Sequence, residues 1–207
     1  MNKQTNLNGA IARADFAAIA AWVRPGAKVL DLGCGDGSLL KYLAGTRNTR
    51  GYGVEINDVN VEVCIKNDVN VIQMDLEAGL SIFESNSFDC VILSQTLQAM
   101  KHTETIVREM LRVGRQGIVT FPNFGHWRHR LQVIRGRMPV SDELPYQWYD
   151  TPNIHLCTLK DFERFCQEQG IRILERVVID NGQTIALFPN LLGSLAVYRF
   201  ERAGQAA

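Results

Sequence analysis

The sequence predicts an α/β fold whose seven-stranded, mostly parallel sheet carries helices on both faces. Two observations favour this fold. Short β-prone apolar runs alternate with segments of helical periodicity, which is the pattern of parallel strands joined by crossover helices. The first strand also runs directly into a glycine-rich turn and a helix start, over 28–44. With 207 residues, 46% of them hydrophobic, the chain is long enough for one domain, spanning 1–207, around a single core.

The first half of the chain contains a helix, then strands and helices in alternation. Apolar residues recur at helical spacing from Ile11 to Val23, and Pro25 and Gly26 end that helix. Asn57 and Asp58 are suited to cap a later helix. The expected strands are 28–32, 51–56, 69–74 and 88–93, and the expected helices between the first three run from the glycine turn to about 44 and from 57 to about 67.

The second half continues with a helix over 103–113 and a fifth strand over 117–121. Thr158 followed by Asp161 is close to a capping box and predicts a helix over 159–169. The last two strands, 171–179 and 194–200, have no helical pattern between them, so we expect an antiparallel hairpin at the edge of the sheet. The segment 123–157 stands outside the alternation, and we interpret it as a helix-plus-loop insertion in the single domain.

The composition excludes several classes of protein. Lys plus Arg (22) equals Asp plus Glu (22), so no global field favours nucleic acid or an anionic membrane. No apolar run approaches the roughly 20 residues needed to cross a bilayer, and residues 1–10 lack the apolar core of a signal peptide. The five cysteines form no C-x-x-C pair, so we expect no metal site. Free thiols in a reducing cytoplasm are the simplest interpretation.

The glycine turn is the most informative motif. Gly33, Gly35 and Gly37 alternate, whereas a dinucleotide-binding turn places its third glycine one residue later. Asp31 lies two residues before the first glycine, where it would repel a pyrophosphate and attract an ammonium or sulfonium group. The turn therefore fits S-adenosylmethionine (SAM) better than NAD. Cys34 lies inside the turn as a possible reactive thiolate, but we favour a small residue tolerated in a crowded turn.

Three more polar residues, Glu55, Asp75 and Ser94, lie at the ends of the next three strands. Ligands bind at this edge in an open α/β sheet. Glu55 lies 18 residues after Gly37, near the spacing at which an acid accepts both ribose hydroxyls. Asp75 is placed to accept from an adenine amino group. Each acid alone is more often a surface or capping carboxylate, but together they indicate a SAM site. The expected cofactor-binding residues are Asp31, Gly33, Cys34, Gly35, Gly37, Glu55, Ile56, Asp75, Leu76 and Ser94.

The insertion begins with an apolar stripe at helical spacing, from Phe124 to Met138. Four arginines surround the stripe, and no acidic residue occurs between Asn123 and Ser141. We consider three interpretations: a helix packed on the sheet with a solvated basic face, a docking surface for an acidic patch of a partner protein, and a nucleic-acid surface. The neutral net charge makes the third the least favoured. The arginines are Arg128, Arg130, Arg135 and Arg137.

The insertion ends in an aromatic loop bounded by prolines, over 145–155. This loop could form a lid over the cofactor's methyl group, anchor an interface or close one end of the core, and the sequence leaves these open. Candidate general bases exist, but no spacing distinguishes one of them, so the catalytic residues stay unknown. They are His102, His126, Asp150 and His155.

The cofactor motifs resemble those of the class I SAM-dependent methyltransferases, which have a Rossmann-like fold. They are Val29–Gly37, Gly53–Glu55, Asp75 and Phe88–Ser94. Four longer motifs resemble the MetW family of methionine biosynthesis proteins, and this resemblance covers roughly residues 10 to 190. Those motifs are Leu93–Gln98, Phe121–Trp127, Arg135–Val140 and Leu144–Cys157.

The resemblance to the MetW family implies a function through a partner. Such proteins accompany homoserine O-acyltransferase, which activates homoserine for sulfur incorporation, and no methyl acceptor is established in the family. The expected function is that of a protein that binds SAM or S-adenosylhomocysteine and acts as accessory or regulatory partner of the acyltransferase. The alternative is a SAM-dependent methyltransferase of a small cytosolic metabolite. A membrane partner is not expected, and a nucleic-acid partner is least favoured.

Overall fold

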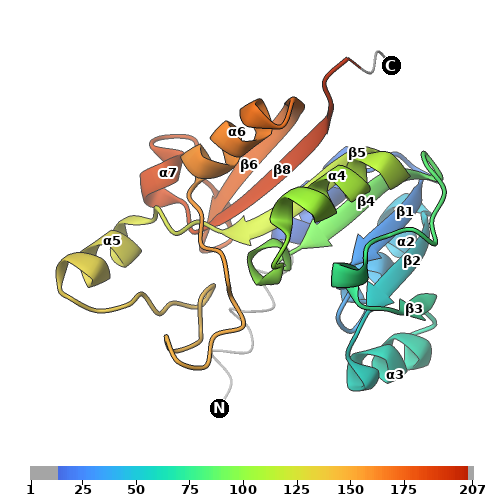
Figure 1. The fold of residues 1–207 in the computed structure, drawn as a ribbon, viewed down its shortest axis with the longest axis horizontal. Coiled ribbons are helices and arrows are strands. Elements are labelled where there is room, and N and C mark those ends of the chain that lie inside the picture. The colour runs from blue at the N-terminus through green and yellow to red at the C-terminus, as the bar shows by residue number, and fades with distance from the viewer. Residues whose placement is uncertain (1–13, 205–207) are drawn as a thin grey trace.

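The structure is a computed structural model that describes residues 14–204. Its centre is one eight-stranded sheet with the order β3-β2-β1-β4-β5-β8-β6-β7 (Figure 1). The first five strands are parallel, and β8 runs antiparallel to both of its neighbours. The strands are β1 (Lys28–Leu32), β2 (Arg50–Glu55), β3 (Val71–Gln73), β4 (Phe88–Ser94), β5 (Gly114–Pro122), β6 (Ile171–Asp180), β7 (Gln183–Thr184) and β8 (Leu195–Arg202).

The helices predicted from the periodicity form within the described residues, and α7 and the two 3-10 turns are additional elements that were not predicted. A helical segment over 14–22 precedes β1, and Ile11, which the sequence assigns to the same helix, lies outside the described residues. Asn57 caps α3 by accepting from the Asn60 amide, and Thr158 and Asp161 form a capping box at the start of α6. The others are α2 (Ser38–Arg47), α3 (Asp58–Lys66), α4 (Thr103–Val113), α5 (Trp127–Ile134), α6 (Leu159–Glu168), α7 (Pro189–Leu192) and the 3-10 turns η1 (Leu76–Ala78) and η2 (Leu97–Ala99).

The strand count predicted from the sequence is wrong by one. All seven expected strands form, and the eighth is β7, which pairs with the end of β6. Asn181 and Gly182 join the two strands, both with positive φ, as a tight hairpin turn requires. β7 has only two residues, too few to produce an alternating pattern, although the Asn-Gly pair itself is a hairpin signal. The antiparallel C-terminal hairpin is confirmed, because β6 pairs with β8.

Apolar side chains on the two faces of the sheet build two core layers. On one face, Leu93 and Phe121 pack with residues of α4 and α6. On the other face, Ile92 and Ile118 pack with α2 and with the helix over 14–22. Because successive strand residues point to opposite faces, helices cover both sides of the sheet (Figure 1). The arrangement leaves the carboxyl ends of β1, β2 and β4 side by side at one edge.

The insertion does not pack on the sheet. Figure 1 shows α5 projecting from the body of the fold, connected to β5 by the short segment 123–126 and to α6 by a long loop. The apolar stripe is correspondingly exposed, with exposed fractions of 43% for Trp127, 81% for Ile134 and 54% for Met138. The interpretation of a helix packed on the sheet is therefore wrong for this stripe. Of the helices that the structure describes, none is long and apolar enough to cross a membrane.

Candidate functional site

The glycine turn after β1 is tied to β2 and crowded by its neighbours. The amides of Gly33 and Cys34 both donate to the Val54 carbonyl, at 2.8 and 3.0 Å. Gly33 has φ +69°, and a Cβ there would lie 2.7 Å from the Thr96 hydroxyl. Gly37 has φ +77°, and a Cβ there would lie 2.9 Å from Val69. Both positions therefore require glycine, which holds the start of α2 close to the end of β1.

Glu55 closes the turn from the end of β2. Its side chain is only 7% exposed, and its Oε2 accepts from the Gly35 amide at 2.9 Å. The other oxygen, Oε1, accepts from the amides of Ile56 and Asn57, each at 2.9 Å. A carboxylate offers about four acceptor positions, so these three amides leave about one free. To accept hydrogen bonds from both hydroxyls of a ribose, Glu55 must therefore give up its hydrogen bond to at least one of these three amides.

Asp31 lies beside Glu55 and has no hydrogen-bond partner at its Oδ1. Its side chain is 2% exposed, and burial, helped by the charge of Glu55, raises its pKa to about 8. An unpaired buried carboxyl group is costly unless a donor or a cation meets it. The environment of Asp31 therefore fits the ammonium or sulfonium group of SAM, whose positive charge would hold the carboxylate ionised.

No role is predicted from the sequence for Asp15, which is buried near the same edge of the sheet. Its side chain is 1% exposed, and burial raises its pKa to about 6. Its Oδ1 accepts from the Phe16 amide at 2.9 Å, and this amide and the nearby Gln95 side chain after β4 partly offset the rise in the pKa. One signal could have revealed this residue: Asp15 lies four positions before the fully buried Ile19, on the same helix face.

The remaining predicted residues lie farther from Asp31. Asp75 is exposed and caps η1 by accepting from the Glu77 amide at 2.9 Å, while Leu76 begins that turn. Ile56 is 59% exposed next to Glu55. The Ser94 hydroxyl pairs with the Thr120 hydroxyl on β5 at 3.0 Å. The structure thus brings Asp31, the turn and Glu55 together, and places Asp75 beyond β3, at the outer side of the same edge.

Cys34 packs inside the turn against a second thiol. Its Sγ is 3.8 Å from the Sγ of Cys64, and the side chain is 8% exposed. Burial, with the nearby charge of Asp31, raises the pKa of the Cys34 thiol, so that the thiol stays protonated at neutral pH. The environment is that of a small apolar residue. Within residues 14–204, no group of three or more His, Cys, Asp or Glu side chains is placed to hold a metal ion.

Three of the four candidate bases have local partners. His155 Nε2 lies 3.3 Å from the Lys101 carbonyl, and Asp150 accepts from the Gln147 amide at 2.8 Å within the aromatic loop. His126 is 4% exposed, and its Nε2 lies 3.5 Å from Asp180. His102 is exposed at the N-cap of α4. These contacts hold loops in place, and none of them identifies one of the four residues as a general base.

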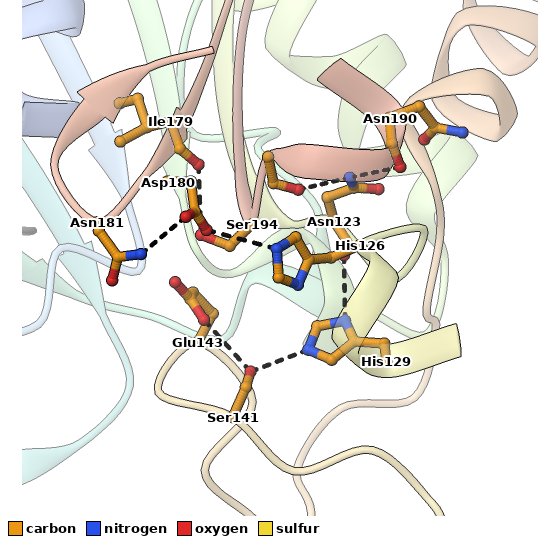
Figure 2. A network of polar contacts seen from close by, with 11 residues as sticks. Asn123, His126, His129, Ser141, Glu143, Ile179, Asp180, Asn181, Asn190 and Ser194 are labelled. Carbon is orange, nitrogen blue, oxygen red and sulfur yellow. Dashed lines mark hydrogen bonds and ion pairs between the residues drawn. The ribbon is translucent and has the colours of Figure 1, made fainter. Parts of the chain in front are cut away.

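A buried polar network fixes the root of the insertion to α7 and the residues just after it, and to the end of β6 (Figure 2). The Asn123 side chain is fully buried, donates to the carbonyls of Asn190 and Gly193, and accepts from the Gly125 amide. The Nδ1 of His129 lies 3.2 Å from the Asn123 carbonyl, and its Nε2 lies 3.0 Å from the Ser141 hydroxyl. Burial lowers the pKa of His129. A neutral His129 therefore donates to the carbonyl and accepts from the hydroxyl.

Beyond this root, the insertion presents a surface that we call the aromatic surface. It combines aromatic and aliphatic side chains that are between 43% and 81% exposed. Arg128 lies over the Trp127 ring at 5.5 Å, and Trp148 and Tyr149 pack edge to face at 5.7 Å. Exposed apolar groups mark an interaction site where they form a contiguous patch. Its members are Trp127, Ile134, Met138, Tyr146, Trp148, Tyr149 and Ile154.

The sheet order, the glycine turn and the acids at the carboxyl ends of β1 and β2 define a Rossmann-like fold of the class I SAM-dependent methyltransferase type. A SAM-dependent methyltransferase from Thermotoga maritima superposes with a TM-score of 0.66 at 16% identity, covering 93% of this chain and 89% of that one. Within this class, the chain belongs to the family described as "Methionine biosynthesis protein MetW", whose model matches residues 13–200. Its role is therefore in methionine biosynthesis.

Two relatives are similar to this chain over most of its length. The chain is 36% identical over 202 residues to the "Bifunctional methionine biosynthesis protein MetXA/MetW" of Rhodopirellula baltica, covering 91% of the chain. It spans only 32% of that relative's length. It is 28% identical over 207 residues to the ubiquinone/menaquinone biosynthesis C-methyltransferase UbiE of Pasteurella multocida, covering 89% of the chain and 72% of the relative.

Proposed function

We propose that this protein binds SAM or S-adenosylhomocysteine and acts as an accessory or regulatory subunit of homoserine O-acyltransferase. The observation that carries the proposal is the aromatic surface on an insertion that is itself fixed to the fold. Its aromatic side chains are of the kind that dominate binding energy in protein interfaces. The bifunctional relative supports the choice of partner, because its name joins MetW to a second methionine biosynthesis component in one polypeptide.

The charge of the insertion favours an acidic face on the partner. Arg128, Arg135 and Arg137 are exposed, and the sequence from 123 to 141 contains no acidic residue. Complementary charge speeds the encounter, and the desolvated aromatic groups supply most of the affinity. Salt should therefore slow association more than it speeds dissociation.

Calorimetry with the acyltransferase from the same organism tests the partnership. We expect Trp148→Ala to weaken the complex by about 2 kcal/mol, or roughly thirtyfold. Ile65→Ala on α3 is the matched control, because Ile65 is 63% exposed outside the insertion and its loss should leave affinity unchanged. Arg135→Glu should slow association, whereas Lys41→Glu on α2 should not. Absence of a complex at micromolar concentration would remove the proposal.

The cofactor part of the proposal rests on Asp31 and Glu55. Asp31 would attract the positively charged end of SAM, Glu55 would accept from the ribose, and the glycine turn would let the backbone approach the ligand. Asp75 would accept from the adenine amino group, with Leu76 beside it. The likeness to a SAM-dependent methyltransferase supports the same ligand class. When bound, SAM would supply a methyl group activated by its sulfonium.

A second candidate is methyl transfer to a small metabolite. The buried acids favour it, since Asp15, with a pKa of about 6, could act as a base near the same edge. The C-methyltransferase relative also belongs to that reaction class. Incubation with labelled SAM and a small-molecule extract tests it. Binding of SAM with no labelled product would contradict this candidate and leave the accessory role standing.

A further inference from the structure

The segment 95–101, which we call the bridging segment, follows β4 and contains the 3-10 turn η2. Its first residue, Gln95, has φ +50°, which is uncommon for a residue with a side chain. The Gln95 amide donates to the carbonyl and to the hydroxyl of Thr120, at 3.0 and 2.9 Å. Because Thr120 is fully buried on β5, these hydrogen bonds fix the start of the bridging segment to the sheet.

The second residue of the bridging segment packs on the glycine turn. A Cβ at Gly33 would lie 2.7 Å from the Thr96 hydroxyl and 2.9 Å from its methyl group, so the Thr96 side chain lies directly against the Gly33 backbone. Thr96 is also the N-cap of η2, and its carbonyl accepts from the Ala99 amide at 2.9 Å. In such close packing, a shift of the glycine turn displaces the start of η2, and a shift of η2 displaces the turn.

The far half of the bridging segment holds the aromatic loop. The Gln98 carbonyl accepts from the amides of Ile154 and His155, at 2.8 and 3.0 Å, and His155 Nε2 lies 3.3 Å from the Lys101 carbonyl. Among the described residues, every hydrogen bond that ties 145–156 to the body of the fold ends on the bridging segment. Ile154 is itself part of the aromatic surface. One segment therefore joins the glycine turn to the loop part of that surface.

The bridging segment also contacts the predicted adenine side of the cofactor site. The Lys101 amide donates to Glu77 Oε1 at 2.7 Å, and Glu77 belongs to η1, which Asp75 caps. A ligand held between Asp31 and Asp75 would therefore contact both elements against which the bridging segment packs. Those contacts favour the arrangement in which the bridging segment is in place. A ligand shifts an equilibrium only through such a difference in affinity between two arrangements.

We propose that binding of SAM or S-adenosylhomocysteine holds the loop over 145–156 against the bridging segment, so that occupancy of the cofactor site controls the order of the aromatic surface. This inference rests on the proposed function and names its regulation. The two arrangements are the loop attached at the Gln98 carbonyl and the loop released from it. Because coupling between two sites is reciprocal, a partner that binds the attached loop would strengthen cofactor binding by the same factor.

Hydrogen–deuterium exchange on the full chain, with and without saturating S-adenosylhomocysteine, tests this coupling in the absence of any partner. We expect the amides of Ile154 and His155 to exchange at least about fivefold more slowly with the ligand, the low end of usual coupling factors. The amides of Gly136 and Arg137 are the internal control, because they donate to carbonyls of α5 and not to the bridging segment. Their exchange rates should not change.

A substitution then tests the contact with the glycine turn. Thr96→Ala removes the side chain that packs on Gly33 and should reduce the effect of saturating ligand on the two loop amides to less than about twofold. Thr105→Ala is the matched control, because Thr105 is exposed on α4 and lies outside the bridging segment, and it should respond like the wild type. A wild-type response in Thr96→Ala would overturn the coupling through the bridging segment.

Calorimetry on the same samples separates this inference from the proposed function. If S-adenosylhomocysteine binds while the loop amides exchange at their original rate, or while the control amides slow equally, the coupling is overturned and the proposed function stands. If no binding is detected, the cofactor part of the proposed function is overturned together with the coupling.

Discussion

Asp31 and Glu55 lie close together at the carboxyl ends of β1 and β2, and both residues are almost fully buried. Three backbone amides already occupy Glu55, whereas Oδ1 of Asp31 has no hydrogen-bond partner. The sequence predicts that the two acids are neighbours but not these contacts, because the contacts depend on the three-dimensional path of the glycine turn. The burial of Asp15 is indicated only by its spacing to Ile19, since a single acid in an amphipathic helix usually faces water.

The raised pKa of Asp31 predicts how stability changes with pH in the cofactor-free protein. The folded state holds its proton to about pH 8, against an ordinary value of 3.8. The stability from this group is therefore fully present below its ordinary pKa and is lost as the pH rises through about 8. The Asn side chain of the Asp31→Asn variant does not titrate, so the variant should not lose this stability. The difference in unfolding free energy, variant minus wild type, should therefore increase from pH 5 to pH 9 in urea titrations.

The control for this prediction is Asp142→Asn, because Asp142 is exposed in the insertion. Its stability should follow the wild type across the same pH range. Parallel curves for Asp31→Asn and the wild type would mean that Asp31 is ionised at neutral pH in the folded protein.

Glu55 carries the second prediction at the residue scale. Glu55→Ala should weaken SAM or S-adenosylhomocysteine binding more than tenfold, because hydrogen bonds to a charged group contribute about 1.5–3 kcal/mol each. Calorimetry measures this loss, and Glu62→Ala on exposed α3 is the control. Because Glu55 also holds the turn, Glu55→Gln checks the result with the shape preserved. Unchanged affinity in both variants would contradict the ribose role.

At the scale of elements, regular strands and helices are predictable and the insertion is not. The apolar periodicity places α4 at its observed bounds, Thr103–Val113, because a core face repeats every three or four residues. The same pattern misleads at α5, where the residues that attach the helix are polar and the apolar stripe faces outward. β7 is missed because two residues carry no period. Periodicity identifies amphipathic segments, but it does not identify what covers them.

The network at the root of the insertion gives a prediction at this scale. Asn123→Ala removes two buried hydrogen bonds and one partly buried one, and leaves two carbonyls and one amide without partners. The variant should lose about 3 kcal/mol or more of unfolding free energy. Urea titration measures the loss, with Gln167→Ala on the exposed face of α6 as control. Limited proteolysis between 135 and 157 should also become faster, and an unchanged cleavage rate would show that other contacts hold the insertion.

At the scale of the whole molecule, the fold separates two surfaces. The proposed cofactor site lies at the carboxyl ends of β1 and β2, whereas the aromatic surface lies on an insertion that follows β5. Nothing in the glycine turn predicts the second surface, which is why the fold alone does not determine the function. Family membership places the chain in methionine biosynthesis. In the proposed function, the insertion would be the part of the chain that contacts another protein.

The rate of homoserine acylation tests this account most directly. The acyltransferase should be assayed alone, with this chain, and with the Trp148→Ala variant, each with and without SAM. We expect the rate to rise with added chain and to saturate, with Trp148→Ala requiring a higher concentration for the same rate. A rate that does not change at any concentration of the wild-type chain, with or without SAM, would contradict the accessory role.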